Sequence, residues 1–151
     1  YVTTIANSGT CYNLTLVDKI AGHNNDEVTD NHAQVRNQID MDSEYWDIIH
    51  TGMRRVVEKK GYYSNLDVDV AGKTGTAQEN LNRPNHAVFI SYAPYEAPEI
   101  SVTVRVAHGY TSDYSAQIAK DVYEYYYGLK DTDEIITGTA SSLETGTING
   151  D

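Results

Sequence analysis

The chain has 151 residues, enough for one compact domain, and its formal net charge is −11. This charge argues against nucleic acid or an anionic membrane surface as a direct partner, because both require clustered lysine and arginine. The single cysteine, Cys11, excludes an internal disulfide, and no apolar run approaches the roughly 20 residues that span a bilayer.

The first forty residues predict little regular structure. Residues 1–7 resemble the tail of a helix, with Gly9 placed to end it in a left-handed cap. Residues 15–20 predict a short strand, and the polar residues 21–40 predict an extended surface loop. A chain that begins within a helix suggests that its beginning is missing.

The first long helix is predicted from about Ser43 to Lys59, with Asp42 or Ser43 as its N-cap. Its apolar stripe is predicted from three- and four-residue spacing and consists of Trp46, Ile49, Met53 and Val56.

Three strands are predicted next, over residues 66–71, 86–92 and 100–106. The second is almost continuously apolar and should lie well inside a sheet, whereas the third alternates and should have one wet face. The connections between them are short, as antiparallel hairpins require.

A final helix is predicted from about Thr111 to Tyr127. Its inner side is predicted to carry Ile118, Val122, Tyr125 and Tyr126, and Gly128 ends it. Residues 129–151 are rich in threonine, serine, glycine and acid, which is typical of a polar tail. The expected fold class is α+β, an antiparallel sheet flanked by helices.

Residues 71–78, with the sequence Ala-Gly-Lys-Thr-Gly-Thr-Ala-Gln, are the richest in chemistry. Lys73 supplies a positive charge for a carboxylate, and the hydroxyls of Thr74 and Thr76 can donate hydrogen bonds to it. Gly75 lets a ligand approach the backbone closely, and the Thr76 amide can point at an oxygen that becomes negative during acyl transfer. A strand that ends in a turn uses such residues often, so the tripeptide alone is weak evidence.

The surrounding residues strengthen this interpretation. Residues 46–57, 70–78 and 85–94, together with 5–10 and 14–20, resemble the C-terminal third of class B penicillin-binding proteins, in the order that this family has. The resemblance covers about residues 1–128, and its nearest subtype is the PBP2-like, cell-elongation type. Residues 1–128 are therefore expected to be the C-terminal portion of a transpeptidase domain with the β-lactamase-like fold, and residues 129–151 a tail.

This resemblance implies a peptidoglycan D,D-transpeptidase that cross-links stem peptides through a serine acyl-enzyme and is the target of β-lactam antibiotics. It implies that Lys73, Thr74, Gly75 and Thr76 hold the D-Ala-D-Ala or drug carboxylate, with the Thr76 backbone amide in the oxyanion hole. It implies no cofactor. It also implies that the whole protein is anchored in the bacterial membrane, lies at its extracytoplasmic face, works with a membrane glycosyltransferase and helps to determine cell shape.

The chain departs from the family pattern at the nucleophile. The family uses Ser-x-x-Lys and Ser-x-Asn, both N-terminal to Lys-Thr-Gly, and none of the nine serines here lies in either motif. The nucleophile and two further sheet strands are expected upstream, in another part of the transpeptidase domain. The chain alone is expected to be inactive, and to self-associate or to be marginally stable.

Other interpretations stay open. The Lys-Thr-Gly strand also occurs in β-lactamases and penicillin sensors, and a non-catalytic peptide-binding module is a further alternative. No metal site is predicted, because the five histidines lack H-x-x-x-H and H-E-x-x-H spacing.

Overall fold

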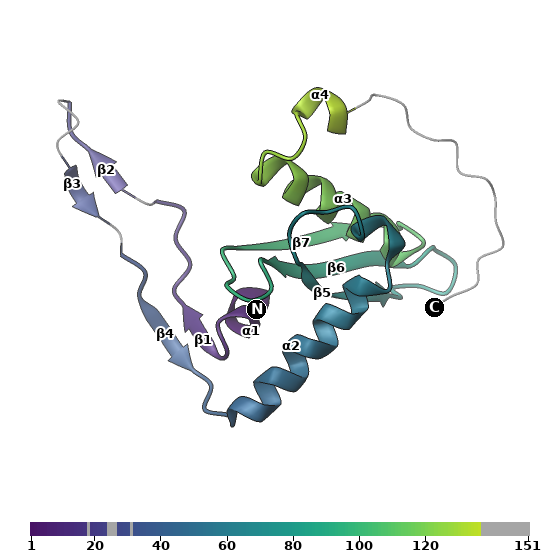
Figure 1. The fold of residues 1–151 in the computed structure, drawn as a ribbon, viewed down its shortest axis with the longest axis horizontal. Helices are drawn as coiled ribbons and strands as arrows, with labels where there is room; N and C mark the ends of the chain where they lie inside the picture. The colour runs from purple at the N-terminus through teal and green to yellow at the C-terminus, as the bar shows by residue number, and fades with distance from the viewer. Residues whose placement is uncertain (18, 24–26, 31, 137–151) are drawn as a thin grey trace.

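The computed structural model describes residues 1–17, 19–23, 27–30 and 32–136. A three-stranded antiparallel sheet has helices against both faces, and a narrow arm extends from it (Figure 1). The predicted α+β class is confirmed. The strands are β1 Thr10–Tyr12, β2 Lys19–Ala21, β3 Glu27–Asp30, β4 Val35–Gln38, β5 Ala71–Ala77, β6 His86–Ala93 and β7 Ile100–Val106. The helices are α1 Val2–Ala6, α2 Ser43–Glu58, the 3-10 helix η1 Gly61–Tyr63, α3 Ser112–Tyr126 and α4 Thr132–Ile135.

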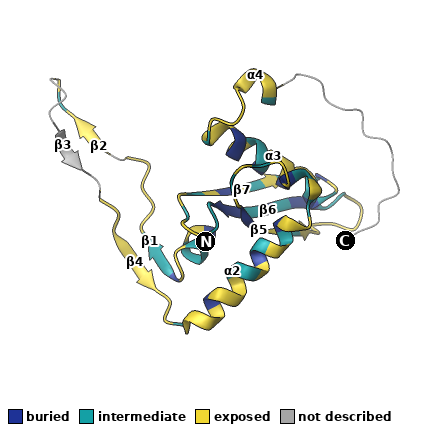
Figure 2. Cartoon of the chain, in the orientation of Figure 1, coloured by how far each residue is buried: buried dark blue, intermediate teal, exposed yellow. Residues whose placement is uncertain are grey.

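The central sheet has the order β5-β6-β7, with β6 bonded on both sides. The register pairs Ala77 with His86 at one end of the β5–β6 ladder and Ala71 with Tyr92 at the other. The predicted strands at 86–92 and 100–106 are confirmed. Strand β6 is the most buried of the three, as its apolar run indicates (Figure 2).

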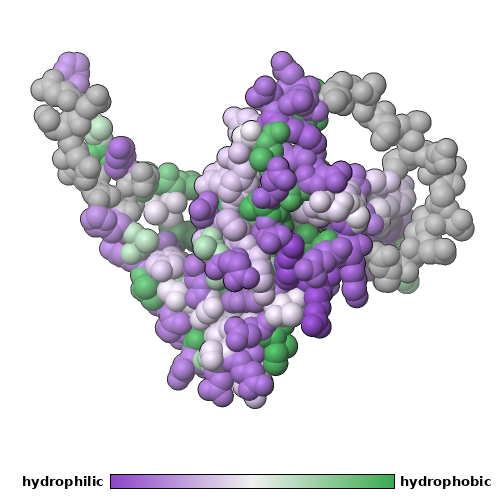
Figure 3. Space-filling view, in the orientation of Figure 1, coloured by the Kyte–Doolittle hydropathy of each residue, from purple (hydrophilic) through white to green (hydrophobic). Residues whose placement is uncertain are grey.

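One face of the sheet packs against α3. The core there joins Phe89 of β6 to Ala116, Ala119 and Tyr123 of α3. The helix is where the sequence places it, but the prediction of its inner side was wrong. Tyr125 and Tyr126 are 63% and 52% exposed, and Ile118 and Val122 are also exposed. Ala116 and Ala119 face the sheet beside the large Tyr123, and their small side chains let the helix approach closely. Ile118 and Val122 remain outside, and apolar side chains show over α3 in Figure 3.

The other face of the sheet packs against α1 and α2. Its core joins Val2, Met53, Ala71 and Tyr92. Helix α2 agrees with the predicted 43–59, but its buried stripe is Trp46, Met53 and Val57, and Ile49 is exposed. Met53 packs against Ala71 and Tyr92, whereas Val57 belongs to the core cluster that contains Val70 and Phe89, so tertiary neighbours that the spacing does not specify select the buried stripe.

Gly9 joins α1 to the arm and has the expected left-handed backbone, with φ +97°. A Cβ there would lie 2.6 Å from the Ile39 carbonyl oxygen and 2.8 Å from Trp46 Cζ2. Glycine is therefore required both by the conformation and by the close approach of the chain.

The arm is the main departure from the predictions. Strand β1 pairs with β4 and β2 with β3, both antiparallel, so the segment predicted as a loop at 21–40 contains paired strands. The strand predicted at 15–20 begins only at Lys19, and residues 15–17 lie outside any strand. The described side chains from residue 13 to residue 40 are almost all exposed (Figure 2).

Two other segments differ from expectation. The strand predicted at 66–71 starts only at Ala71, because residues 61–70 form η1 and an irregular connection. In the segment expected as a tail, Thr132–Ile135 form the single turn α4, and residues 137–151 lie outside the described residues.

Candidate functional site

The Lys-Thr-Gly residues lie in the middle of β5, at the edge of the central sheet. In the described part of the chain β5 has β6 as its only strand neighbour, so one row of its backbone groups is left without a strand partner. An edge of this kind can bind an extended peptide as an additional strand.

Strand alternation divides the side chains of this motif between the two faces of the sheet. Lys73 is paired with Ile90, whereas Thr74 and Thr76 are paired with Phe89 and Ala87 on the opposite face. A ligand that contacts the ammonium group and both hydroxyls must therefore lie along the free edge of β5 rather than over one face.

Lys73 and Thr76 are exposed, and Thr74 and Gly75 are partly buried. Lys73 Nζ donates a hydrogen bond of 2.6 Å to the Thr74 carbonyl oxygen. No carboxylate forms an ion pair with this ammonium group among the described residues. The cation is thus held by a neutral acceptor, and it is accessible to an anionic ligand.

The two glycines of β5 have different surroundings. A Cβ on Gly72 would lie 2.4 Å from Phe89 Cζ and 2.9 Å from the Ile90 carbonyl oxygen. A Cβ on Gly75 would lie 3.6 Å from Val88 Cβ, an ordinary contact. Gly72 is therefore required for packing, whereas the fold does not require glycine at position 75.

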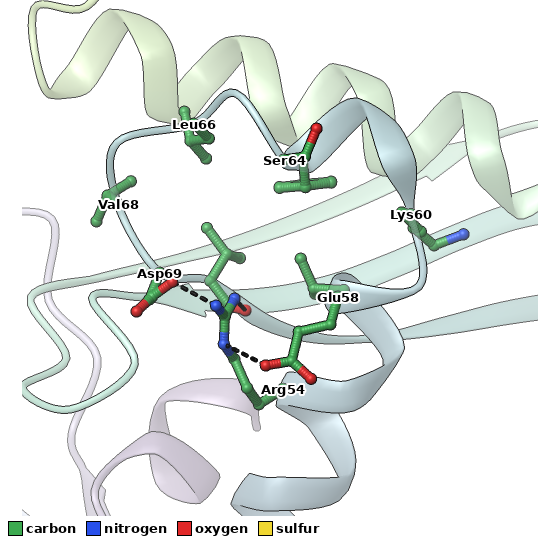
Figure 4. A pocket seen from close by; sticks show the side chains of 10 residues that line it. Arg54, Glu58, Lys60, Ser64, Leu66, Val68 and Asp69 are labelled. Carbon is green, nitrogen blue, oxygen red and sulfur yellow. Dashed lines mark hydrogen bonds and ion pairs between the residues drawn. The ribbon is translucent and has the colours of Figure 1, made fainter.

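A cleft of about 210 Å³ lies between α2 and the connection that leads into β5 (Figure 4). Arg54 lies at its centre, forms an ion pair with Asp69, and contacts Glu58 at 3.3 Å. Its Nη1 also donates to the Val70 carbonyl oxygen, at 3.1 Å. These contacts of Arg54 link α2 to Asp69 and Val70, the two residues that precede β5.

The structure also brings together residues that the sequence analysis did not combine. Glu79, His86 and His108 each have a ligand atom within 4.8 Å of the others. Two come from the β5–β6 hairpin and one from the turn after β7, so a search for local histidine spacing could not find them. No helix in the described residues is long and apolar enough to cross a membrane.

Residues 1–124 match the protein family described as the penicillin binding protein transpeptidase domain. Penicillin-binding protein 2A of Bacillus subtilis is 31% identical over 86% of this chain and 21% of its own length. Peptidoglycan D,D-transpeptidase MrdA of Haemophilus influenzae is 33% identical over 54% of this chain and 16% of its own length.

Among solved structures, penicillin-binding protein 2B of Streptococcus pneumoniae superposes with a TM-score of 0.75 at 25% identity. The match covers 87% of this chain and 24% of that one. The chain spans about one fifth of the length of the curated relatives that it matches over most of its own length.

Proposed function

The chain belongs to the penicillin-binding protein transpeptidase family, and we propose that it is part of a peptidoglycan D,D-transpeptidase whose strand β5 holds the substrate carboxylate. The observation that carries the proposal is the position of Lys73, exposed and without a carboxylate partner among the described residues, on the edge strand of the sheet. The name of the Haemophilus influenzae relative, a D,D-transpeptidase, supports the reaction class.

In this proposal the terminal D-Ala-D-Ala of a stem peptide lies along the free edge of β5. Lys73 Nζ and the hydroxyls of Thr74 and Thr76 bind the terminal carboxylate, and Gly75 leaves room for the ligand backbone. The Thr76 amide donates to the carbonyl oxygen that becomes negative. One such donor typically lowers the barrier by about 2.7–4 kcal/mol.

The nucleophile is a serine from another part of the protein. Its hydroxyl oxygen attacks the carbonyl carbon of the penultimate D-alanine, the amide bond breaks, and D-alanine leaves with the proton. The amine of a neighbouring stem peptide then takes the acyl group and releases the serine. β-Lactams acylate the same serine, and their carboxylate occupies the same edge of β5.

The names of the relatives also support a subtype within the family. Relatives named penicillin-binding protein 2A and 2B support a class B, PBP2-like assignment, and with it a role in cell shape. We place the whole protein at the extracytoplasmic face of the bacterial membrane, where it works with a glycosyltransferase. Its upstream transpeptidase residues cover surfaces that this chain leaves exposed.

The decisive experiment compares acylation of the full-length protein and its Lys73→Ala variant by a fluorescent penicillin. A charge-assisted hydrogen bond contributes about 1.5–3 kcal/mol, so K73A should lower the second-order rate constant by roughly 10- to 100-fold. Lys59→Ala, at the end of α2, is the matched control and should react as the wild type does. Wild-type acylation of K73A would refute the proposed role of this strand.

A second experiment tests the origin of the nucleophile. The 151-residue chain by itself, incubated with the same fluorescent penicillin, should remain unlabelled. Covalent labelling at any of its nine serines would contradict the proposal that the nucleophile lies elsewhere.

A further inference from the structure

Three titratable side chains meet where the Lys-Thr-Gly strand ends. Glu79 belongs to the connection after β5, His86 begins β6, and His108 lies in the turn between β7 and α3. His86 Nε2 lies 3.0 Å from Glu79 Oε2, and the His86 side chain is 8% exposed. The two imidazole rings are in contact, with centroids 4.8 Å apart.

Hydrogen bonds to backbone groups determine the tautomer of each ring. The His108 backbone N–H donates to His86 Nδ1 at 3.1 Å, so Nδ1 must carry a lone pair, and the proton of the neutral ring lies on Nε2. The Pro84 carbonyl oxygen lies 2.9 Å from His108 Nδ1. A carbonyl only accepts, so His108 carries its proton on Nδ1.

This arrangement does not suit a metal ion, although two histidines and a carboxylate are a ligand set that zinc accepts. A neutral imidazole has one lone pair on nitrogen, and that of His86 already accepts the His108 amide. Its Nε2–H is a donor that faces Glu79. The cluster is therefore built to hold segments together by hydrogen bonds.

The segment held by the cluster is a strained turn. His108 and Tyr110 both have left-handed backbones, with φ 54° and 63°. Between them, Gly109 is buried, and a Cβ there would lie 2.9 Å from Val106 and 3.0 Å from Ala87. Such conformations persist where surrounding contacts over-determine them, often near functional sites.

Three hydrogen bonds tie this turn to the start of β6. Two are those of His108 to His86 Nδ1 and to Pro84, and the third runs from the Tyr110 amide to the Asn85 carbonyl oxygen at 3.3 Å. The start of β6 is thus anchored to the β7–α3 turn as well as to its neighbouring strands.

The start of β6 in turn places the end of β5. Ala77 is paired with His86 and Thr76 with Ala87, and β6 is the only described strand beside β5. We propose that His86 is a positioning residue: as the Nε2–H tautomer between Glu79 and His108, it fixes the end of β5 and hence the Thr76 amide. This inference rests on the proposed function of β5.

The test uses the full-length protein and three substitutions of His86, with acylation by a fluorescent penicillin and the thermal midpoint as readouts. His86→Ala loses both hydrogen bonds and should lower the acylation rate constant by roughly 10- to 100-fold, as expected for a displaced reacting group. His86→Asn keeps an acceptor near the Nδ1 position, and His86→Gln keeps a donor near the Nε2 position. Each should recover part of the lost rate.

His50→Asn is the matched control, because it also removes a partly buried histidine, one whose Nε2 lies 2.8 Å from the Ile5 carbonyl oxygen and whose ring contacts Tyr92 rather than Glu79 or His108. It should lower the thermal midpoint without slowing acylation. If H86A does not fold, H86N replaces it in the comparison. Wild-type acylation rates in both H86N and H86Q would overturn the inference.

The tautomer gives an independent readout in the unmodified protein. In protein labelled with ¹⁵N-histidine, the His86 resonances are those that H86N removes. Their shifts should show a protonated Nε2 and an unprotonated Nδ1. The opposite pattern, or stoichiometric zinc binding that H86A abolishes, overturns the inference. The K73A variant distinguishes the two proposals. If K73A is acylated at the wild-type rate, the proposed function of β5 is wrong. If K73A is acylated slowly but H86A at the wild-type rate, only the positioning role of His86 is wrong.

Discussion

The Tyr123 hydroxyl donates a hydrogen bond of 2.8 Å to Ser91 Oγ, which joins α3 to the central strand inside the core. Ser91 Oγ in turn donates to the Val102 carbonyl oxygen at 3.3 Å, so the link extends to β7. Both side chains are fully buried. Because Tyr123 donates to Ser91 and Ser91 donates to Val102, loss of the Ser91 hydroxyl and loss of the Tyr123 hydroxyl should have unequal effects on stability.

Ser91→Ala should therefore destabilise the protein more than Tyr123→Phe. S91A leaves the Tyr123 hydroxyl buried without its acceptor and should cost about 1–3 kcal/mol, whereas Y123F leaves Ser91 bonded to Val102 and should cost about 0.5–1.5 kcal/mol. Urea denaturation measures both. Tyr125→Phe, at a side chain that is 63% exposed, is the control. A larger loss in Y123F would contradict this direction of donation.

Replacement of Tyr92 by phenylalanine should affect the unfolding free energy in the opposite direction to Tyr123→Phe. It is fully buried, and its hydroxyl has no hydrogen-bond partner in the described part of the chain. Burial raises the pKa of Tyr92 to about 12, with smaller contributions from Tyr95 and Glu96. Tyr92→Phe removes an unpaired polar group and should leave the unfolding free energy unchanged or raise it by about 1 kcal/mol.

Tyr63→Phe provides the comparison for Y92F. The Tyr63 hydroxyl donates to the Ala116 carbonyl oxygen at 2.8 Å, so Y63F should lose about 0.5–1.5 kcal/mol. Equal losses in Y92F and Y63F, measured by urea denaturation, would show that the Tyr92 hydroxyl is hydrogen-bonded in solution.

The two glycines of β5 should separate folding from binding. Gly72→Ala forces a Cβ against Phe89 and the β6 backbone and should lower the unfolding free energy by about 1–3 kcal/mol. Gly75→Ala meets only an ordinary contact and should unfold like the wild type. Thermal denaturation gives the comparison. G75A should nevertheless acylate more slowly in the full-length protein, and a normal rate would show that no ligand approaches this backbone closely.

The ion pair between Lys60 and Asp113 should make stability depend on pH. The hydrogen bond from Lys60 lowers the pKa of Asp113; burial opposes this, and the Tyr62 hydroxyl adds to the lowering. Because the folded pKa is below the unfolded value, the stabilisation is present above about pH 4 and is lost as pH falls through the folded pKa.

Asp113→Asn tests this pair. The Asp113 side chain is 47% exposed, so the effect at pH 7 should be at most about 1 kcal/mol. The difference in thermal midpoint between D113N and the wild type should shrink as pH falls below about 4. Asp67→Asn, at an exposed carboxylate, is the control. A difference that stays constant down to pH 2 would show that the effect does not depend on the charge of Asp113.

The sequence predicted best those elements whose pattern is local. Strands β6 and β7 and helix α2 were found because apolar runs, alternation and three- to four-residue spacing act within one segment. The arm was missed because β1 pairs with β4 across more than twenty residues, and strands of three or four residues are too short to show a hydrophobic pattern. The inner side of α3 was wrong because small residues, which favour close packing, carry less hydrophobic signal than tyrosine and isoleucine.

The residues of the candidate site also divide into those that a local sequence pattern brings together and those that only the fold brings together. Lys73 and Thr76 could be placed together from the sequence because they belong to a contiguous motif, and the structure puts its strand at the edge of the sheet. Their role in binding stays a prediction. The partners of His86 were not found, because Glu79 faces it across a hairpin and His108 comes from the next turn. Only tertiary structure brings those three groups together.

The arm leads to the last prediction. Leu14 and Leu16 are 97% and 106% exposed, and they lie two residues apart in the stretch between β1 and β2. Side chains this exposed contribute nothing to the folded core, so the double variant Leu14→Ser, Leu16→Ser should keep its unfolding free energy within about 0.5 kcal/mol.

Exposed leucines in an extended segment favour association between copies, so the double variant of the 151-residue chain should sediment with a lower mean mass. Leu81→Ser, at a site 87% exposed in the β5–β6 connection, is the matched control and should alter neither quantity. A fall in stability in the double variant would show that the arm folds back onto the sheet in solution, because only then would these leucines bury surface within one copy.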